Sequence, residues 1–535
     1  MRLSLVAALL LLATPAARAA EASCSFLVSV SDAEGFGNLT PYWAQEAVGG
    51  DLAAAFVAAS QQASSVDVGV IDGGVTLGSL PEERLGPTLK ACLRDQALCE
   101  LLPDQHGTAV SSIIVGQSPV GIASRAILAQ AASALNPREK PGESWAFEGA
   151  LKRFLATAPL PPIVNMSMYA SDSLYNGAFK SLTESLSGKT IVVRSAGNFF
   201  PKMPYRFTVQ PPGLVVGSVA PNGLLSDMSQ EAPFVTVTAP SNYEIRSYRP
   251  TSTFGGRELF AFRGTSGAAP VVTASLANVL SFLPELTLEQ AKRLIERTSL
   301  KTIGYASNPG MNGAGVVNAY KLARVAERLR ARGFDARRES MLTDDATYAF
   351  TDEVASLRAE AAALGAGCDA DRRRLALLRA ALFLAPNEEG VRHDVGLIYR
   401  SLGFDAQADF FDASSIASVL ADMKTDYDRV LLAIRARVAL DGALVGDFAK
   451  IRRPGERAEL VVLAGKALGR ASAPLVDVAL VDTSPLVRIK ALIFLDDAHD
   501  ARECHELAAR TLRSERDDDV RAAASDALER CASER

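Results

Sequence analysis

Histidine is the scarcest chemically useful residue in this chain, with four among 535 residues. Three of them, at positions 393, 499 and 505, fall in the C-terminal helical region, where acidic neighbours of His499 and His505 indicate a solvated helix face. His106 is therefore the only imidazole in the first 330 residues. If a general base acts in this region near neutral pH, His106 is the imidazole available for it, because histidine has an ordinary pKa in that range.

Long apolar runs and basic blocks are also lacking. No segment beyond residue 20 is apolar over the length that a membrane span requires. The net charge of −5 is spread along the chain without a basic cluster, which argues against nucleic acid as a main partner. A hydrophobic content of 48% with 22% charged residues predicts ordered domains, and the length allows two to four of them.

The first 19 residues have the features of a secretory signal peptide. Arg2 precedes an apolar core at 3–12, and the small-residue stretch 17–19 favours cleavage after Ala19. The apolar core is too short for a membrane anchor, and a glutamate shortly before Cys24 argues against a lipoprotein site. We therefore expect an exported protein, periplasmic or extracellular, with no membrane span after cleavage.

Export gives the six cysteines a possible structural role. Cys92 and Cys99 flank a short loop and are candidates for one disulfide, because a six-residue gap without nearby histidine is not zinc-ligand spacing. Cys504 and Cys531, in the C-terminal helices, are candidates for a second. The sequence leaves the connectivity open.

Strand and helix patterns alternate over the first 330 residues, which predicts an α/β fold with a mostly parallel, doubly wound sheet. Polar motifs stand where these elements begin or end. Asp72 follows a β-branched strand at 66–71, and His106 begins a helical run to 115. Asn198 follows a strand at 191–196, and its amide is able to turn the chain or to donate to an oxyanion.

Ser266 lies between an extended run (258–262) and a helical pattern that continues to 283. A serine at the start of a helix meets unpaired N–H groups and the positive end of the helix dipole, which favour developing negative charge. Alone, this serine would be interpreted as a helix cap.

Four motifs in one order resemble the subtilisin-like serine peptidases, the subtilase family, over about residues 40–328. They are Asp72-Gly73-Gly74, His106-Gly107-Thr108, Ser195-Ala196-Gly197-Asn198 and Gly264-Thr265-Ser266 with Pro270. The order Asp, His, Ser is that of subtilisin. The resemblance implies a doubly wound sheet with helices on both faces and a polypeptide substrate. It implies neither a cofactor nor a metal.

The resemblance also implies a role for each matching residue. Ser266 would be the nucleophile, His106 its base and Asp72 the group that orients the imidazole. Asn198 would hold the oxyanion together with the backbone N–H of Ser266. The substrate-binding edge would be formed by Ser167, Met168 and Tyr169.

Several positions depart from the family pattern. Gly73 stands where a hydroxyl residue is usual, and Ser112 and Ala274 stand where glycine is usual. Met168-Tyr169-Ala170 replaces Leu-Gly-Gly at the substrate edge. About 50 residues separate the expected cleavage site from Asp72, so an N-terminal propeptide domain is not expected.

Three alternatives follow from these departures and from the serine motif. The sedolisin relatives are disfavoured, because they have Glu and Asp where this chain has His106 and Asn198. Another class of serine hydrolase is disfavoured, because Ala268 breaks the Gly-x-Ser-x-Gly pattern. A catalytically weak subtilase-like scaffold that binds proteins remains the alternative function.

We expect a catalytic domain at 24–330, a charged linker at 331–345 and an all-α domain at 346–535. One stretch of that domain, 381–408, has the spacing of a tetratricopeptide repeat. The segments 482–488 and 517–521 are similar to the starts of HEAT-type repeats. Such hairpins stack into a solenoid that binds proteins, although an irregular helical bundle remains an alternative.

Overall fold

The computed structural model divides into two compact units, Gly37–Asp412 and Ala413–Arg535, apart from the segments that precede Gly37. No helix within the ranges described is both long and apolar enough to cross a membrane. The predicted signal peptide, 1–19, lies outside the described residues. The structure describes residues 30–31, 38–95, 101–133, 144–167, 178–198, 213–226, 228–231, 233–241, 245–253, 255–302, 304–305, 312–335, 339–412, 420, 423, 425–435 and 438–533.

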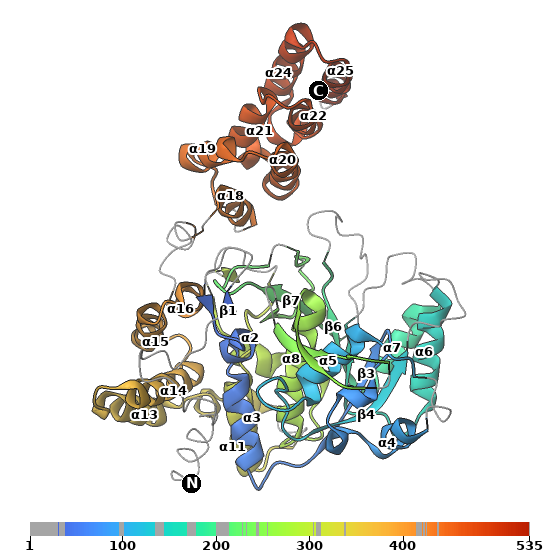
Figure 1. Ribbon diagram of the computed structural model, residues 1–535, viewed down its shortest axis with the longest axis vertical. Coiled ribbons are helices and arrows are strands. Elements are labelled where there is room, and N and C mark those ends of the chain that lie inside the picture. Colours follow the sequence, from blue (N-terminus) through green and yellow to red (C-terminus); the bar gives the residue numbers. More distant parts are fainter. Residues whose placement is uncertain are drawn as a thin grey trace. The chain divides into compact units, whose positions relative to one another are not determined.

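A parallel sheet with the strand order β4-β3-β5-β6-β7-β8 organises the first unit (Figure 1). Because parallel neighbours need crossover connections, this order confirms the predicted doubly wound sheet. The strands are β3 (Val66–Asp72), β4 (Ala126–Ser133), β5 (Ile163–Met166), β6 (Ile191–Ser195), β7 (Leu214–Val219) and β8 (Val237–Pro240).

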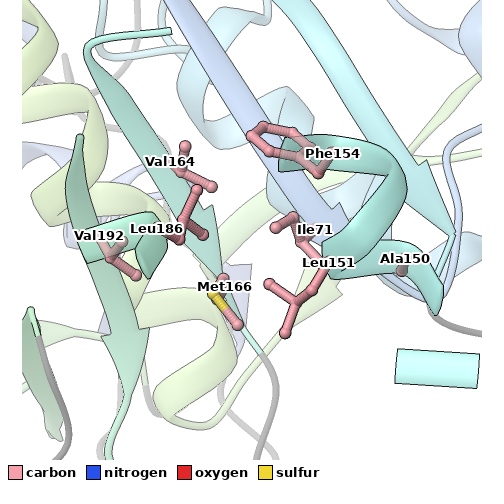
Figure 2. Packing of buried hydrophobic residues seen from close by; sticks show 8 residues of the cluster. All are labelled: Ile71, Ala150, Leu151, Phe154, Val164, Met166, Leu186 and Val192. Atoms are coloured by element: carbon pink, nitrogen blue, oxygen red, sulfur yellow. The ribbon is translucent and has the colours of Figure 1, made fainter. Parts of the chain in front are cut away.

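Helices cover both faces of this sheet. On one face, α6 (Ser144–Ala156) and α7 (Ala178–Ser187) pack on strand side chains. Figure 2 shows this cluster, in which the aliphatic and aromatic side chains of α6 meet those of β3 and β5. Its members are Ile71, Ala150, Leu151, Phe154, Val164, Met166, Leu186 and Val192.

The opposite face carries α5 (Gln105–Val115) and α8 (Thr265–Leu280), which also pack on each other. The alternation of side chains along β5 sends Val164 and Met166 into the first cluster, whereas Asn165 accepts a hydrogen bond from Thr273 of α8 (2.9 Å). An antiparallel hairpin, β9 (Ile245–Arg249) and β10 (Glu258–Phe262), precedes α8 and contacts α5.

The first unit extends beyond the predicted end of the catalytic domain. It includes four helices that we expected in a separate domain from 346, namely α13 (Thr351–Ala363), α14 (Cys368–Leu384), α15 (Glu389–Ser401) and α16 (Asp405–Asp412). Arg379 of α14 forms a bidentate ion pair with Asp51 of α3 (Gly50–Ala59), at 2.8 and 2.9 Å. The compact unit therefore ends near Asp412, not at the predicted linker 331–345.

The second unit is all helical, as the patterning of the C-terminal region predicted. Cys504 and Cys531 are joined in it by a disulfide between its last two helices, with their Cα atoms 5.7 Å apart. Its helices are α18 (Asp426–Arg435), α19 (Gly442–Lys450), α20 (Pro454–Leu468), α21 (Ala473–Leu480), α22 (Pro485–Ile493), α23 (Leu495–Ala498), α24 (Ala501–Ser514) and α25 (Asp518–Ser533).

Candidate active site

Asp72 ends strand β3 at the carboxyl edge of the sheet, where doubly wound folds place their sites. Its side chain is 1% exposed, and its Oδ1 atom accepts a hydrogen bond from the backbone N–H of Gly73 (2.7 Å). The turn that follows is tight: a Cβ atom on Gly74 would lie 2.2 Å from the carbonyl oxygen of Leu102, so only glycine fits there.

His106 lies in the first turn of α5. Asp104 caps this helix, because its Oδ2 atom accepts from the backbone N–H of Gly107 (2.9 Å). Gly107 itself passes close to the Asp72 turn, since a Cβ atom there would lie 1.9 Å from the carbonyl oxygen of Gly74. This close approach brings Nδ1 of His106 to 2.7 Å from Oδ1 of Asp72.

The environment of this pair alters the pKa of both groups. Burial raises the pKa of Asp72, and the hydrogen bonds from His106 and Gly73 oppose that rise. For His106, burial acts to lower the pKa, but the hydrogen bond and the negative charge of Asp72 outweigh it, so the pKa lies above its ordinary value. The imidazole is thus held through Nδ1, while its side chain remains 41% exposed.

Ser266 is the second residue of α8, which begins directly after Gly264, whose φ of +83° favours glycine. Two reciprocal hydrogen bonds hold it against β5: its hydroxyl donates to the carbonyl of Ser167 (3.2 Å), and the hydroxyl of Ser167 donates to the carbonyl of Ser266 (2.8 Å). Across the part of the chain that the structure describes, Ser266 makes no hydrogen bond with His106. The aromatic ring of Phe262, next to α8, meets the His106 ring edge-on at 5.1 Å.

Asn198 lies on the loop after β6, and Thr265 holds its side chain. The Oδ1 atom of Asn198 accepts from both the N–H and the hydroxyl of Thr265, at 2.9 Å each. Among the described residues the amide N–H₂ group has no hydrogen-bond partner, and it lies close to Gly264 at the start of α8. Sequence reasoning missed this role of Thr265, although its place between Gly264 and Ser266 was a signal.

The other predicted residues have mixed outcomes. Ser167 is buried, and its side chain bonds to Ser266. Met168 and Tyr169 lie outside the described residues, so the substrate edge stays a prediction. Cys92 is buried, but its predicted partner, Cys99, lies outside the described residues as well.

One group of possible metal-ligand residues occurs in the described ranges: Asp72, Asp104 and His106, with ligand atoms within 4.8 Å of one another. Two carboxylate oxygens of this group already have partners, because Oδ2 of Asp104 accepts the capping N–H of α5 and Oδ1 of Asp72 accepts from His106. The arrangement therefore fits an aspartate that orients an imidazole.

Part of this chain matches a known family. Residues 100–323 match the model of the subtilase family (peptidase S8). Residues 100–323 form a subtilase domain. The matched range contains His106, Asn198 and Ser266, whereas Asp72 precedes it.

Several solved structures are similar to about half of this chain. For the subtilase cytotoxin SubAB assembly, 19% of aligned residues are identical, covering 54% of this chain and 97% of that chain, with a TM-score of 0.40. MycP1 with its N-terminal propeptide removed is 21% identical (52% and 97% covered, TM-score 0.37). A protease from Pseudoalteromonas arctica is 18% identical (50% and 91% covered, TM-score 0.37). No curated protein matches the chain.

Proposed function

We propose that the subtilase domain is an exported serine endopeptidase and that the helices beyond it bind a protein partner. The observation that carries the enzymatic part is the 2.7 Å contact between His106 Nδ1 and the buried Asp72. That contact fixes the tautomer of His106, so that Nε2 is the basic nitrogen. Ser266 at the start of α8 supplies the nucleophile.

The proposed reaction begins with attack of Ser266 Oγ on the carbonyl carbon of a peptide bond, while Nε2 of His106 takes the hydroxyl proton. The N–H₂ group of Asn198 and the backbone N–H of Ser266 stabilise the negative oxygen of the tetrahedral intermediate. His106 then protonates the leaving amine, and water hydrolyses the acyl-enzyme by the same steps. Loss of one oxyanion donor costs about 3–4 kcal/mol of transition-state stabilisation in such sites.

A catalytically weak, protein-binding scaffold is the second candidate, and two observations favour it. The Oδ2 atom of Asp72 is buried without a hydrogen-bond partner in the described structure, where Gly73 offers no hydroxyl. In addition, the hydroxyl of Ser266 bonds to the carbonyl of Ser167 and must turn before His106 can take its proton.

Labelling with a fluorophosphonate probe separates the two candidates. The full mature chain should be labelled, Ser266→Ala should abolish labelling, and His106→Ala should reduce its rate strongly. Ser275→Ala is the matched control on the same helix, because its hydroxyl donates to the carbonyl of Val271 one turn earlier. A folded wild-type chain that is not labelled would support the scaffold, and labelling only after removal of the helices beyond 412 would identify them as an inhibitor.

A further inference from the structure

Arginine ion pairs place three helices of the second unit in register. The guanidinium of Arg457, in α20, donates to both carboxylate oxygens of Asp482 (2.7 and 2.9 Å). Arg488, in α22, repeats this arrangement with Glu515 (2.8 and 3.2 Å). Each arginine lies in the first turns of its helix, and each acid precedes the next equivalent helix. Helices α20, α22 and α25 are therefore successive copies of one repeat, with α22 between the other two (Figure 1).

Helix α22 presents apolar side chains to solvent. Leu486 and Ile493 are 45% and 42% exposed, and they lie seven residues apart, so they share one side of the helix. Val481, in the turn before α22, is 77% exposed. The opposite side of α22 is buried through Val487 and Leu492. We call Leu486 and Ile493 the α22 stripe.

The repeat register identifies what flanks the α22 stripe. Arg488 is equivalent to Arg521, so Leu486 and Ile493 have Asp519 and Asp526 as their equivalents on α25. Neither aspartate has an ion-pair partner in the described part of the chain, so both charges are available. Arg530 of α25 donates to the carbonyl of Leu492 (2.7 Å), which confirms that the two helices run side by side to their C-terminal ends.

On the other side of the α22 stripe, helix α20 carries a glycine and an exposed carboxylate. The equivalent of Leu486 there is Gly455, and a Cβ atom on this glycine would meet no atom within 4 Å. Glu459, the equivalent of Lys490, is exposed and has no ion-pair partner among the described residues. Leu486, Lys490 and Ile493 each have one equivalent on α20 and one on α25. Among these described residues Lys490 is the single cation, and the three carboxylates are Glu459, Asp519 and Asp526. The apolar stripe thus lies beside a position without a side chain, Gly455, and has carboxylates on both neighbouring helices.

We propose that the α22 stripe binds an amphipathic helix of a partner protein, with apolar side chains two turns apart and lysine or arginine on its flanks. The apolar side chains would cover Leu486 and Ile493, and the basic flank would face Asp519 and Asp526. This inference rests on the proposed partner-binding role of the helices and not on the peptidase activity.

Two labelled synthetic peptides test it. Both form amphipathic helices with leucines along one side, and they differ in carrying lysine or glutamate on the flanks. Fluorescence anisotropy with the full Ser266→Ala chain, which would not cleave the peptides, should show at least about tenfold tighter binding of the lysine peptide. Leu486→Ser and Ile493→Ser should weaken that binding about tenfold or more, and Asp519→Lys with Asp526→Lys should reverse the preference.

Leu397→Ser is the matched control, because Leu397 is 50% exposed on a helix of the first unit. Equal loss of binding in this control, equal affinity for both peptides, or no binding of the lysine peptide would overturn the proposal. A chain that sediments as a dimer, and as a monomer when it carries Ile493→Ser, would instead make the α22 stripe a contact between two copies. Fluorophosphonate labelling of wild-type chain reports separately on the peptidase proposal.

Discussion

At the scale of single residues, the contact between Asp72 and His106 sets the pH above which the proposed base, His106, is neutral. Because Asp72 raises the pKa of His106, the imidazole keeps its proton to a higher pH than usual, and only its neutral form accepts the proton of Ser266. The labelling rate of wild type should therefore rise with pH through a pKa above the ordinary value of about 6.5. Asp72→Asn should move this rise to lower pH and slow labelling by a factor on the order of 10³–10⁴. Labelling rates between about pH 5 and pH 9 measure both effects.

The same contact makes the stability of the fold depend on pH. Since the pKa of His106 is raised in the folded chain, its contribution to stability is fully present at low pH and is lost as the pH rises through the folded-state pKa. An unchanged pH profile in Asp72→Asn, with the fold intact, would contradict the electrostatic coupling that the 2.7 Å contact implies.

At the scale of elements, Ser112 ties helix α5 to the hairpin that leads to Ser266. The hydroxyl of Ser112 accepts a hydrogen bond from the backbone N–H of Tyr248 in β9 (2.8 Å), and that N–H is buried. Ser112→Ala leaves the N–H without a partner, which should lower the free energy of unfolding by about 1–3 kcal/mol. Labelling should also slow, because the hairpin carries Phe262 against the His106 ring.

Thermal denaturation and labelling rates measure these two effects. Ser275→Ala again serves as the control, and it should change both quantities much less, because its hydroxyl only returns to its own helix. Ser112→Cys keeps a weak acceptor of similar size and should lie between the wild type and the alanine variant. A loss of stability with no change in labelling would mean that the hydrogen bond between Tyr248 and Ser112 does not position His106.

These elements also show what the sequence could predict. Local sequence patterns predict that Asp72, His106 and Ser266 lie at the ends of strands or the starts of helices, because strand ends, helix caps and glycine turns depend on neighbouring residues. The contact of Ser112 with Tyr248 joins residues 136 positions apart, so no local pattern reveals it. Sequence reasoning noted Ser112 only as a departure from the family. The substrate edge at Met168 and Tyr169 stays a prediction.

At the scale of the whole molecule, the first compact unit extends past the predicted domain boundary for a related reason. Helical composition changes near 346, but composition does not tell which surface the helices cover. The ion pair of Arg379 with Asp51 joins residues 328 positions apart, and both side chains are nearly buried. Phe383 also lies against Gly49, where a Cβ atom would come within 2.9 Å of its ring. Helices α13–α16 are therefore part of the first compact unit.

This packing predicts where the chain can be shortened. A chain that ends after Asp412 should unfold cooperatively and keep its labelling, whereas one that ends after Asp345 should lose both, because Asp51 would lose its partner.

In the full chain, Arg379→Met should lower the free energy of unfolding by about 3–5 kcal/mol, since it leaves a nearly buried carboxylate unpaired. Adding Asp51→Leu should restore much of that loss, because two apolar side chains then replace the pair. Arg358→Met, which breaks ion pairs with Glu388 and Asp394 between partly exposed side chains, is the control and should cost less than about 1 kcal/mol. Denaturant unfolding followed by circular dichroism measures these values. A stable, labelled chain ending after Asp345 would instead show that α13–α16 form a separate domain.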